Sequence, residues 1–426
     1  MIAERPHSLL DAVPPELPPE LASAPSVQAL VHGQRQGQWW WTLLRKVTYA
    51  ITDTGSLQRS TQQEPIHTAY AKHAPLPDWI VEAAGRAGSM KTVPEPRAFQ
   101  SGTDVVVRAH AASAQPVRSM LAGLAVGKQV HKLRVWGKRQ SQWHAGQVAF
   151  SEPEPFEMVP LRSELAYGGS DPHAVRGALA AVQSQMDETS WRRGRAFLQD
   201  TLPCTVPLAY ARNPIGMGYV ADPVPEALHG VWLPRIELER DLLTPLRFSQ
   251  GRSLEWLSRP VPAGMDFMDM RMFPRTAMLG LPPPGFVVGC TDCPEVEWGQ
   301  VPVDFSRGNV LTAEDAQVAT AVHPDAARCA PIGLRMGVLG GREPVSLIGL
   351  RADLPRWDFV LPGERPAFEV PGVGRLSSQL FQVFIDVDAR RVELLWAASW
   401  QATRELERGE DRSVLRTVAT QAEVAP

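Results

Sequence analysis

Residues 39–51 read Trp-Trp-Trp-Thr-Leu-Leu-Arg-Lys-Val-Thr-Tyr-Ala-Ile, a run rich in aromatic and β-branched side chains. Such side chains fit a pleated, half-buried surface, so the run predicts a strand or a pair of strands. Thr52-Asp53-Thr54-Gly55 follows, and these residue types favour a turn. The first folded signal of the chain is therefore a strand that ends in a tight connection.

Strand patterns recur on both sides of a middle region. They cover residues 104–112, 121–128, 130–136, 148–150 and 157–161, then short pieces near 230–239 and 286–288, then 333–339, 344–350, 357–361, 380–386 and 391–399. Helical spacing covers residues 174–185, 191–198 and 313–322. Short polar connections between successive strands favour antiparallel pairing over a parallel sheet.

Proline is unusually frequent, at 39 of 426 residues, against a usual share of about 5%. Because proline breaks helix interiors and central strands, such a chain must consist of short elements and many ordered turns. We therefore predict an α+β fold that is predominantly antiparallel β, with sandwich-like sheets, a few helices and many Pro/Gly-rich loops.

Composition shifts divide the chain into five segments. We predict a Pro-rich extended leader over 1–35 and a β-rich N-terminal lobe over 36–170. A helical and loop-rich middle region over 171–300 and a β-rich C-terminal lobe over 301–404 follow. Residues 405–426 are predicted to form a charged, frayed tail.

The bulk numbers exclude several classes of function. A net charge of −3 and a pI near 6.4 provide no basic field for nucleic acid. The densest basic cluster, Trp191-Arg192-Arg193-Gly194-Arg195, predicts a solvated helix face. No apolar run is long enough for membrane insertion, and the N-terminus lacks a signal-peptide pattern. With four cysteines in the chain, the reducing cytoplasm is the expected compartment.

Cys290-Thr291-Asp292-Cys293 is the strongest candidate for metal or redox chemistry. A zinc site would need a second close pair, whereas His323 and Cys329 are single and irregularly spaced. The histidines form no paired metal-binding spacing, and no nucleophile elbow or phosphate-binding loop occurs. We predict free thiols, no metal and no cofactor.

Carboxylates provide the alternative of an enzyme. Two suitably placed carboxylates suffice for glycoside hydrolysis. Glu237 and Glu239 would share one face of a strand, and Glu164 lies in another acidic segment. A hydrolase that uses Glu237 or Glu164 is therefore the competing hypothesis.

Two further stretches are distinctive: Ser-Glu-Pro-Glu-Pro-Phe-Glu-Met-Val-Pro-Leu over 151–161 and Glu-Leu-Ala-Tyr-Gly-Gly over 164–169. They resemble the signature of a large bacterial family of unknown biochemical function. Its genes lie beside type VI secretion genes, and its members are regarded as effector adaptors. Similar pieces occur in the family's order at Lys46–Tyr49, Gly102–Val105, Lys132–Arg139, Asn213–Tyr219, Leu233–Glu237, Asp304-Phe305, Gly340–Glu343 and Leu361-Pro362.

The resemblance spans about residues 40–400 and has departures. Arg235 and Lys138 replace an expected asparagine and an Asp-like residue, and Trp396–Trp400 differs from the family's Trp-Arg ending. The segment between Gly169 and Asn213 is also longer than the resemblance leads us to expect. These differences indicate a divergent branch.

The resemblance implies a cytoplasmic, non-catalytic adaptor or chaperone. It would bind a type VI secretion effector or its spike-tip domain and load it on the secretion spike. Aromatic residues and arginines often dominate such interfaces, and a strand edge could pair with the client. The candidate partner-binding residues are Trp39, Trp40, Trp136, Phe156, Tyr167, Asn213, Arg235 and Glu237. A third hypothesis is a structural component of the secretion apparatus, which would self-assemble without a client.

Overall fold

The computed structural model describes residues 27–35, 38–69, 71–74, 76, 88–96, 100, 102–202, 208–210, 213, 215–239, 242–250, 263–267, 286–287, 336–404, 407, 414–416 and 418–424. The pair Cys290 and Cys293 and the predicted helix over 313–322 lie outside these residues.

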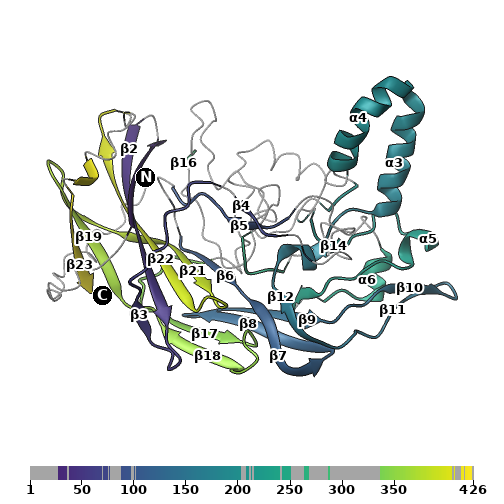
Figure 1. The fold of residues 1–426 in the computed structure, drawn as a ribbon, viewed down its shortest axis with the longest axis horizontal. Helices are drawn as coiled ribbons and strands as arrows, with labels where there is room; N and C mark the ends of the chain where they lie inside the picture. Colours follow the sequence, from purple (N-terminus) through teal and green to yellow (C-terminus); the bar gives the residue numbers. More distant parts are fainter. Residues whose placement is uncertain are drawn as a thin grey trace, which may run out of the picture.

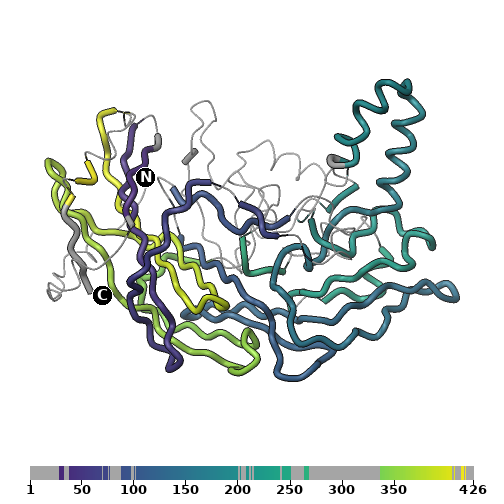
Figure 2. The backbone as a smooth tube through the Cα atoms, viewed as in Figure 1, coloured from purple at the N-terminus to yellow at the C-terminus, as the bar shows by residue number. Residues whose placement is uncertain are grey.

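The run that opens the folded part is one long central strand. β2 (Gln38–Ile51) pairs antiparallel with β1 (Val27–Arg35) on one side and with β22 (Arg391–Ala402) on the other. The sheet has seven strands, and the other four are β21 (Gln379–Asp386), β6 (Asp104–Arg108), β3 (Leu57–Arg59) and β16 (Phe286–Val287). Only the β21–β6 pair in this sheet is parallel. Figure 2 shows purple and yellow strands side by side, and these are β2 from the N-terminal part of the chain and β22 from the C-terminal part.

A second sheet has five antiparallel strands. Its order is β15 (Ile236–Leu238), β9 (Gln129–Trp136), β8 (Ser119–Val126), β17 (Pro344–Ile348) and β18 (Arg356–Val360). Three strands, β20 (Gly374–Ser377), β19 (Glu364–Val370) and β23 (Ala419–Val424), form a third sheet. The remaining described sheets are smaller and have two strands each. They pair β7 (His110–Val117) with β12 (Phe156–Pro160), β10 (Ser141–His144) with β11 (Gln147–Phe150), β13 (Tyr167–Gly168) with β14 (Met217–Gly218), and β4 (Ala71–Lys72) with β5 (Met90–Thr92).

The two large sheets enclose one main core. Val47 and Val383 of the seven-stranded sheet belong to the same buried cluster as Leu124 and Leu347 of the five-stranded sheet. A second cluster, the end core, joins Leu43 to the third sheet; its buried residues are Leu30, Leu43, Phe368, Val370, Ala398 and Trp400. The central strands β2, β21 and β22 are buried on both faces, and successive side chains point to opposite faces, so one strand can contribute to two clusters. The predicted α+β, mainly antiparallel and sandwich-like fold is confirmed.

Several local predictions were wrong. The segment predicted as an extended leader contains β1, because Leu30 packs in the end core and nine positions pair with β2. The segment predicted as a frayed tail contains β23, which pairs with β19 through its backbone. The strand predicted over 104–112 is two strands, β6 and β7, and residues 336–340 are not a strand.

Strands from both predicted lobes share both large sheets. β9 and β17 belong to one sheet, and β2 and β22 belong to the other. The described strands of segments 36–170 and 301–404 therefore fold together. The segment boundaries themselves stay a prediction.

The predicted helices of the middle region are confirmed as α3 (Pro172–Gln185) and α4 (Glu188–Thr201). Each begins earlier than predicted because Asp171 and Asp187 cap the first turns. They project as a hairpin at one end of the longest axis, opposite β2 and the third sheet (Figure 1). Shorter helices are η1 (Ser163–Leu165), α5 (Pro225–Leu228) and α6 (Pro245–Ser249). No helix in the described part is long and apolar enough to cross a membrane.

Candidate functional site

Six of the eight predicted site residues come together, near the edge of the five-stranded sheet. These residues, with Arg139, form what we name the motif cluster: Trp136, Arg139, Phe156, Tyr167, Asn213, Arg235 and Glu237. The antiparallel pairing of β15 with β9 brings Arg235 next to Trp136, and the Trp136 N–H donates to the Arg235 carbonyl at 2.7 Å. The Arg235 N–H then reaches the Leu165 carbonyl at 2.8 Å. The pairing thus places segments that are far apart in sequence against one another.

Arg139 is the centre of the motif cluster. Its guanidinium carbon lies 4.3 Å from the centroid of the Trp136 ring, and its Nη2 donates to Glu237 Oε2 at 2.6 Å. The second oxygen of Glu237 accepts from the Leu243 N–H at 2.6 Å. Burial lowers the pKa of Arg139, and the charge of Glu237 opposes that shift. Glu237 is therefore fully engaged inside the protein.

The Pro-rich motif over 151–161 packs directly on this centre. A β-carbon on Gly137 would lie 1.7 Å from the Glu154 carbonyl oxygen, so only glycine fits there. Arg235 lies over the Phe156 ring, 5.7 Å from its centroid. Burial lowers the pKa of Arg235 to about 10, against the raising effect of Glu154.

The Gly-Gly motif packs against the Asn-Pro motif. Gly168 and Gly169 have φ of 145° and 84°, and a β-carbon on Gly168 would lie 2.2 Å from the Asn213 carbonyl oxygen. The Asn213 side-chain Nδ2 donates to the carbonyls of Ser163 and Tyr167 at 2.8 and 3.1 Å. Asn213 is completely buried. Its side chain holds two loops together.

The motif cluster carries the base of the α3–α4 hairpin. Buried Asp171 accepts from the N–H groups of His173 and Ala174, which starts α3. Its other oxygen accepts from the Ala221 N–H at 2.9 Å. The Tyr167 and Tyr210 rings meet edge to face beside it, with centroids 5.0 Å apart. The root of the hairpin is thus fixed, although the hairpin extends away from the body (Figure 1).

Most of the hairpin is exposed to solvent. Val175 is the only buried side chain described in α3, and none is buried in the described part of α4. Phe197 is 70% exposed, the largest exposure among the large apolar side chains described. Arg192, Arg193 and Arg195 are exposed, which confirms the predicted solvated helix face.

Trp39 and Trp40 lie elsewhere. Both belong to β2, at the opposite end of the molecule from the hairpin (Figure 1). Both are partly exposed, and the Trp39 ring packs edge to face on His32, 5.6 Å away. The eight candidates therefore do not form one surface. Their predicted contact with a partner stays a prediction, and Asn213 and Glu237 would need the cluster to open first.

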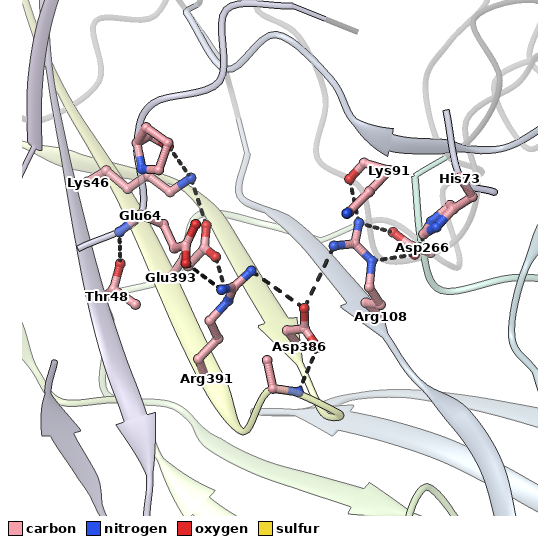
Figure 3. A network of polar contacts seen from close by, with 12 residues as sticks. Lys46, Thr48, Glu64, His73, Lys91, Arg108, Asp266, Asp386, Arg391 and Glu393 are labelled. Atoms are coloured by element: carbon pink, nitrogen blue, oxygen red, sulfur yellow. Dashed lines mark hydrogen bonds and ion pairs between the residues drawn. The ribbon is translucent and has the colours of Figure 1, made fainter. Parts of the chain in front are cut away.

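A network of buried and partly buried charges lies on one face of the seven-stranded sheet (Figure 3). Lys46 Nζ lies 2.8 Å from Glu95 Oε1 and 2.7 Å from Glu393 Oε2, and these three side chains are at most 3% exposed. The Pro65 carbonyl also accepts from Lys46, at 3.0 Å. These contacts fasten the segments around residues 65 and 95 onto the sheet.

The network continues towards β6. Arg391 contacts Glu393 and Glu64, and lies 3.6 Å from Asp386. Asp386 in turn lies 3.7 Å from Arg108 Nη1, and Arg108 Nε donates to Asp266 Oδ2 at 3.0 Å. His73 completes this line, 2.9 Å from Asp266 (Figure 3).

Comparison with known protein families finds one match. The family described as "Uncharacterized protein conserved in bacteria (DUF2169)" matches residues 36–397. The chain belongs to this DUF2169 family. The match runs from the start of β2 into β22 and so includes both large sheets and the motif cluster. No curated protein and no solved structure matches the chain.

In this DUF2169 protein, sequence reasoning missed Arg139 and the charged network. The sequence did hold a signal for the network, because Lys46 and Glu393 are charged residues within largely apolar strands. A charge inside such a strand requires a buried partner. The partners come from distant segments, so the sequence could not identify them.

The two glutamates of the hydrolase hypothesis are each bound by an arginine. Glu237 pairs with Arg139, and Glu164 pairs with Arg162 while accepting from the Ser89 N–H at 3.0 Å. Both are buried. In this conformation both carboxylates act as internal hydrogen-bond acceptors of the DUF2169 fold.

Proposed function

We propose that this protein is a non-catalytic adaptor or chaperone that binds a type VI secretion effector, or its spike-tip domain, and helps load it on the secretion spike. The observation that carries the proposal is the projecting α3–α4 hairpin on its fixed base. The resemblance of the motifs to the adaptor family supports the secretion context, and the adaptor would act in the cytoplasm.

The hairpin has the character of a contact element. Two helices of 14 residues each extend from the body with little burial against it. Phe197 gives the hairpin one exposed aromatic side chain, and aromatic residues often contribute much of the binding energy of an interface. Trp191 and Leu198 are partly buried, at the spacing of one helix face, whereas Phe197 points outward. Phe197 therefore does not take part in the packing of α4 against α3.

The charged side chains of the α3–α4 hairpin indicate which kind of client surface would fit it. Residues 172–201 contain four arginines, namely Arg176, Arg192, Arg193 and Arg195, against Asp187, Glu188 and Asp200. Arg193 lies one helical turn before Phe197, so it borders the apolar position. Glu188 already pairs with Arg192 at 2.7 Å. The complementary client surface is an apolar patch bordered by acidic groups.

The motif cluster contributes rigidity to this function. Its buried hydrogen bonds fix Asp171 and the loops at the root of the hairpin. A preformed contact element loses less conformational entropy on binding than a flexible one. We infer that the family motifs hold the hairpin in position and that the hairpin contacts the client.

The test is an affinity pull-down of the tagged full chain from its own bacterium, with mass spectrometry of the co-eluting proteins. The proposal expects one effector or spike protein in near-equal amount. Recovery of no such protein under several salt conditions contradicts it. Two further arms test the alternatives: substrate turnover lost in Glu237→Gln would indicate the hydrolase, and client-free self-assembly would indicate a structural component.

A further inference from the structure

Two segments lie against the face of the seven-stranded sheet that carries the charged network, and together they form what we name the cover: residues 60–69 and 93–96. The Glu95 N–H donates to the His67 carbonyl at 2.8 Å, and the His67 N–H donates to Glu95 Oε2 at 2.8 Å. These two hydrogen bonds join the segments to each other. The cover is therefore one structural unit on the sheet.

Polar contacts fasten the cover to β2 and β22. The Gln63 side chain accepts from the Thr48 N–H at 2.8 Å and donates to the Thr48 carbonyl at 3.1 Å. The Glu64 N–H donates to Thr48 Oγ1 at 3.0 Å, and the Glu64 carboxylate pairs with Arg391 (Figure 3). With the contacts of Glu95 to Lys46, the cover contributes carboxylates and the sheet contributes cations.

Ile66 adds an apolar contact to this polar set. It is partly buried and packs against one cluster of the sheet, formed by Leu44, Phe381, Leu395 and Ala397. Segments that bury little apolar surface open at a lower free-energy cost than the packed strands beneath them. The cover is thus the part that can leave while the sheet stays paired, and its departure would uncover this apolar cluster.

His67 lies among the charges that fasten the cover. The charged groups that act on it are Lys46 and Glu393 of the sheet and Glu64 and Glu95 nearby. Burial, and then the charge of Lys46, lowers the pKa of His67 against the raising effect of the three carboxylates. The closed cover therefore prefers the neutral ring, whereas an open cover returns the ring to water, where its pKa is about 6.5.

A second histidine responds to acid in the opposite sense. His73 Nε2 lies 2.9 Å from Asp266 Oδ2, and a proton on His73 would strengthen this contact. Close by, the Ser89 N–H donates to Glu164 Oε1 at 3.0 Å. Residues 71–74 and 88–92, which adjoin the cover, are therefore held in place when the cover opens.

We propose that the cover is a local, acid-sensitive latch: protonation of His67 favours an open form in which residues 63–67 and 93–96 leave the sheet while β2, β21 and β22 stay paired. The open form binds the proton more tightly than the closed form, so closure is fully favoured above about pH 6.5 and weakens as pH falls. The latch is independent of the client surface on the hairpin, so either proposal can fail alone.

Hydrogen exchange on the full chain tests the latch at pH 7.5 and pH 5, with rates corrected for the intrinsic effect of pH. The reporters are the amides of Glu64, His67 and Glu95, whose hydrogen bonds belong to the closed cover. Their protection should fall at least about threefold at pH 5, and the amides of β22 should keep theirs. Unchanged protection of the cover, or an equal loss in β22, overturns the proposal. This readout uses the wild-type chain and needs no variant to fold.

Two variants test the assignment to His67. His67→Gln replaces the ring by a neutral polar group, so its cover should keep the same protection at pH 5 as at pH 7.5. His110→Gln is the matched control, because His110 also lies 2.9 Å from a carboxylate, that of Asp388, but belongs to β7. It should lose protection as wild type does. A His67→Gln cover that loses protection like wild type, or equal behaviour of the two variants, overturns the proposal.

Discussion

Lys46 and Glu393 lie on adjacent strands of the seven-stranded sheet, with their charged atoms 2.7 Å apart and both side chains almost fully buried. Glu95, from a segment outside the sheet, contacts the same ammonium group at 2.8 Å. One cation thus holds two carboxylates that would otherwise repel each other in the interior. The contact fixes the covering segment to the outer face of the sheet.

Replacing Lys46 should therefore be costly. Lys46→Met leaves Glu95 and Glu393 buried without their shared cation, and we expect a loss of about 3–5 kcal/mol in the free energy of unfolding. Urea unfolding followed by circular dichroism measures it. Lys132→Met, on the exposed side of β9, is the matched control. A Lys46→Met protein as stable as the control would show that the buried pairs contribute little.

His67 should make stability depend on pH. Burial lowers its pKa below the usual 6.5, and the charge of Lys46 lowers it further, against Glu95. The folded protein therefore prefers the neutral ring, whereas the unfolded chain binds a proton below about pH 6.5. The stabilisation is complete above that pH and is lost as pH falls through the lowered pKa. Between pH 8 and pH 5, wild type should lose more stability than His67→Gln. Parallel losses in the two proteins would contradict this assignment.

Gly137 should tolerate no side chain. A β-carbon there would lie 1.7 Å from the Glu154 carbonyl oxygen, so Gly137→Ala must move the Pro-rich motif. We expect a loss of about 3 kcal/mol or more in unfolding free energy. Gly177→Ala is the comparison, because its β-carbon meets nothing within 4 Å in α3, and it should add about 0.5–1 kcal/mol. Thermal unfolding of both variants checks the pair. Equal melting temperatures would refute the packing argument.

Arg139 should not be replaceable by lysine. Arg139→Lys keeps the charge near Glu237 but loses the planar stacking on Trp136. We expect a loss of about 1–3 kcal/mol. Arg134→Lys, in the more exposed pair with Glu239, should cost less than about 1 kcal/mol. Urea unfolding of the two variants side by side decides the ranking, and the reverse order would contradict a central role for Arg139.

The sequence was sufficient for the fold class because strand signals are local. The alternation of β9 follows the face that it buries, whereas β21 and β22 are nearly continuous apolar runs that are buried on both faces. β1 was missed because the nearby prolines at 14–25 dominated the reading of that segment. β23 was missed because pairing with β19 stabilises it through backbone hydrogen bonds, which composition does not reveal.

The site was predictable only in part, for a related reason. The structure places Trp136, Phe156, Tyr167, Asn213, Arg235 and Glu237 in one region, and their role in partner binding stays a prediction. Their burial could not be inferred, since it depends on segments that meet only in three dimensions, as when the Asn213 side chain joins two loops. Trp39 and Trp40 are of the same residue type as other candidates, yet they lie at the start of β2, far from the motif cluster.

The most direct measurement is the affinity of the recovered client for Phe197→Asp, compared with wild type and with Leu246→Asp. Phe197 and Leu246 are 70% and 69% exposed, so the two variants place a new carboxylate at equally exposed apolar positions. If the hairpin contacts an acidic-bordered client patch, Phe197→Asp should bind at least tenfold more weakly with an unchanged melting temperature, and Leu246→Asp should bind like wild type. Full affinity in Phe197→Asp would contradict the assignment of the hairpin as the client surface.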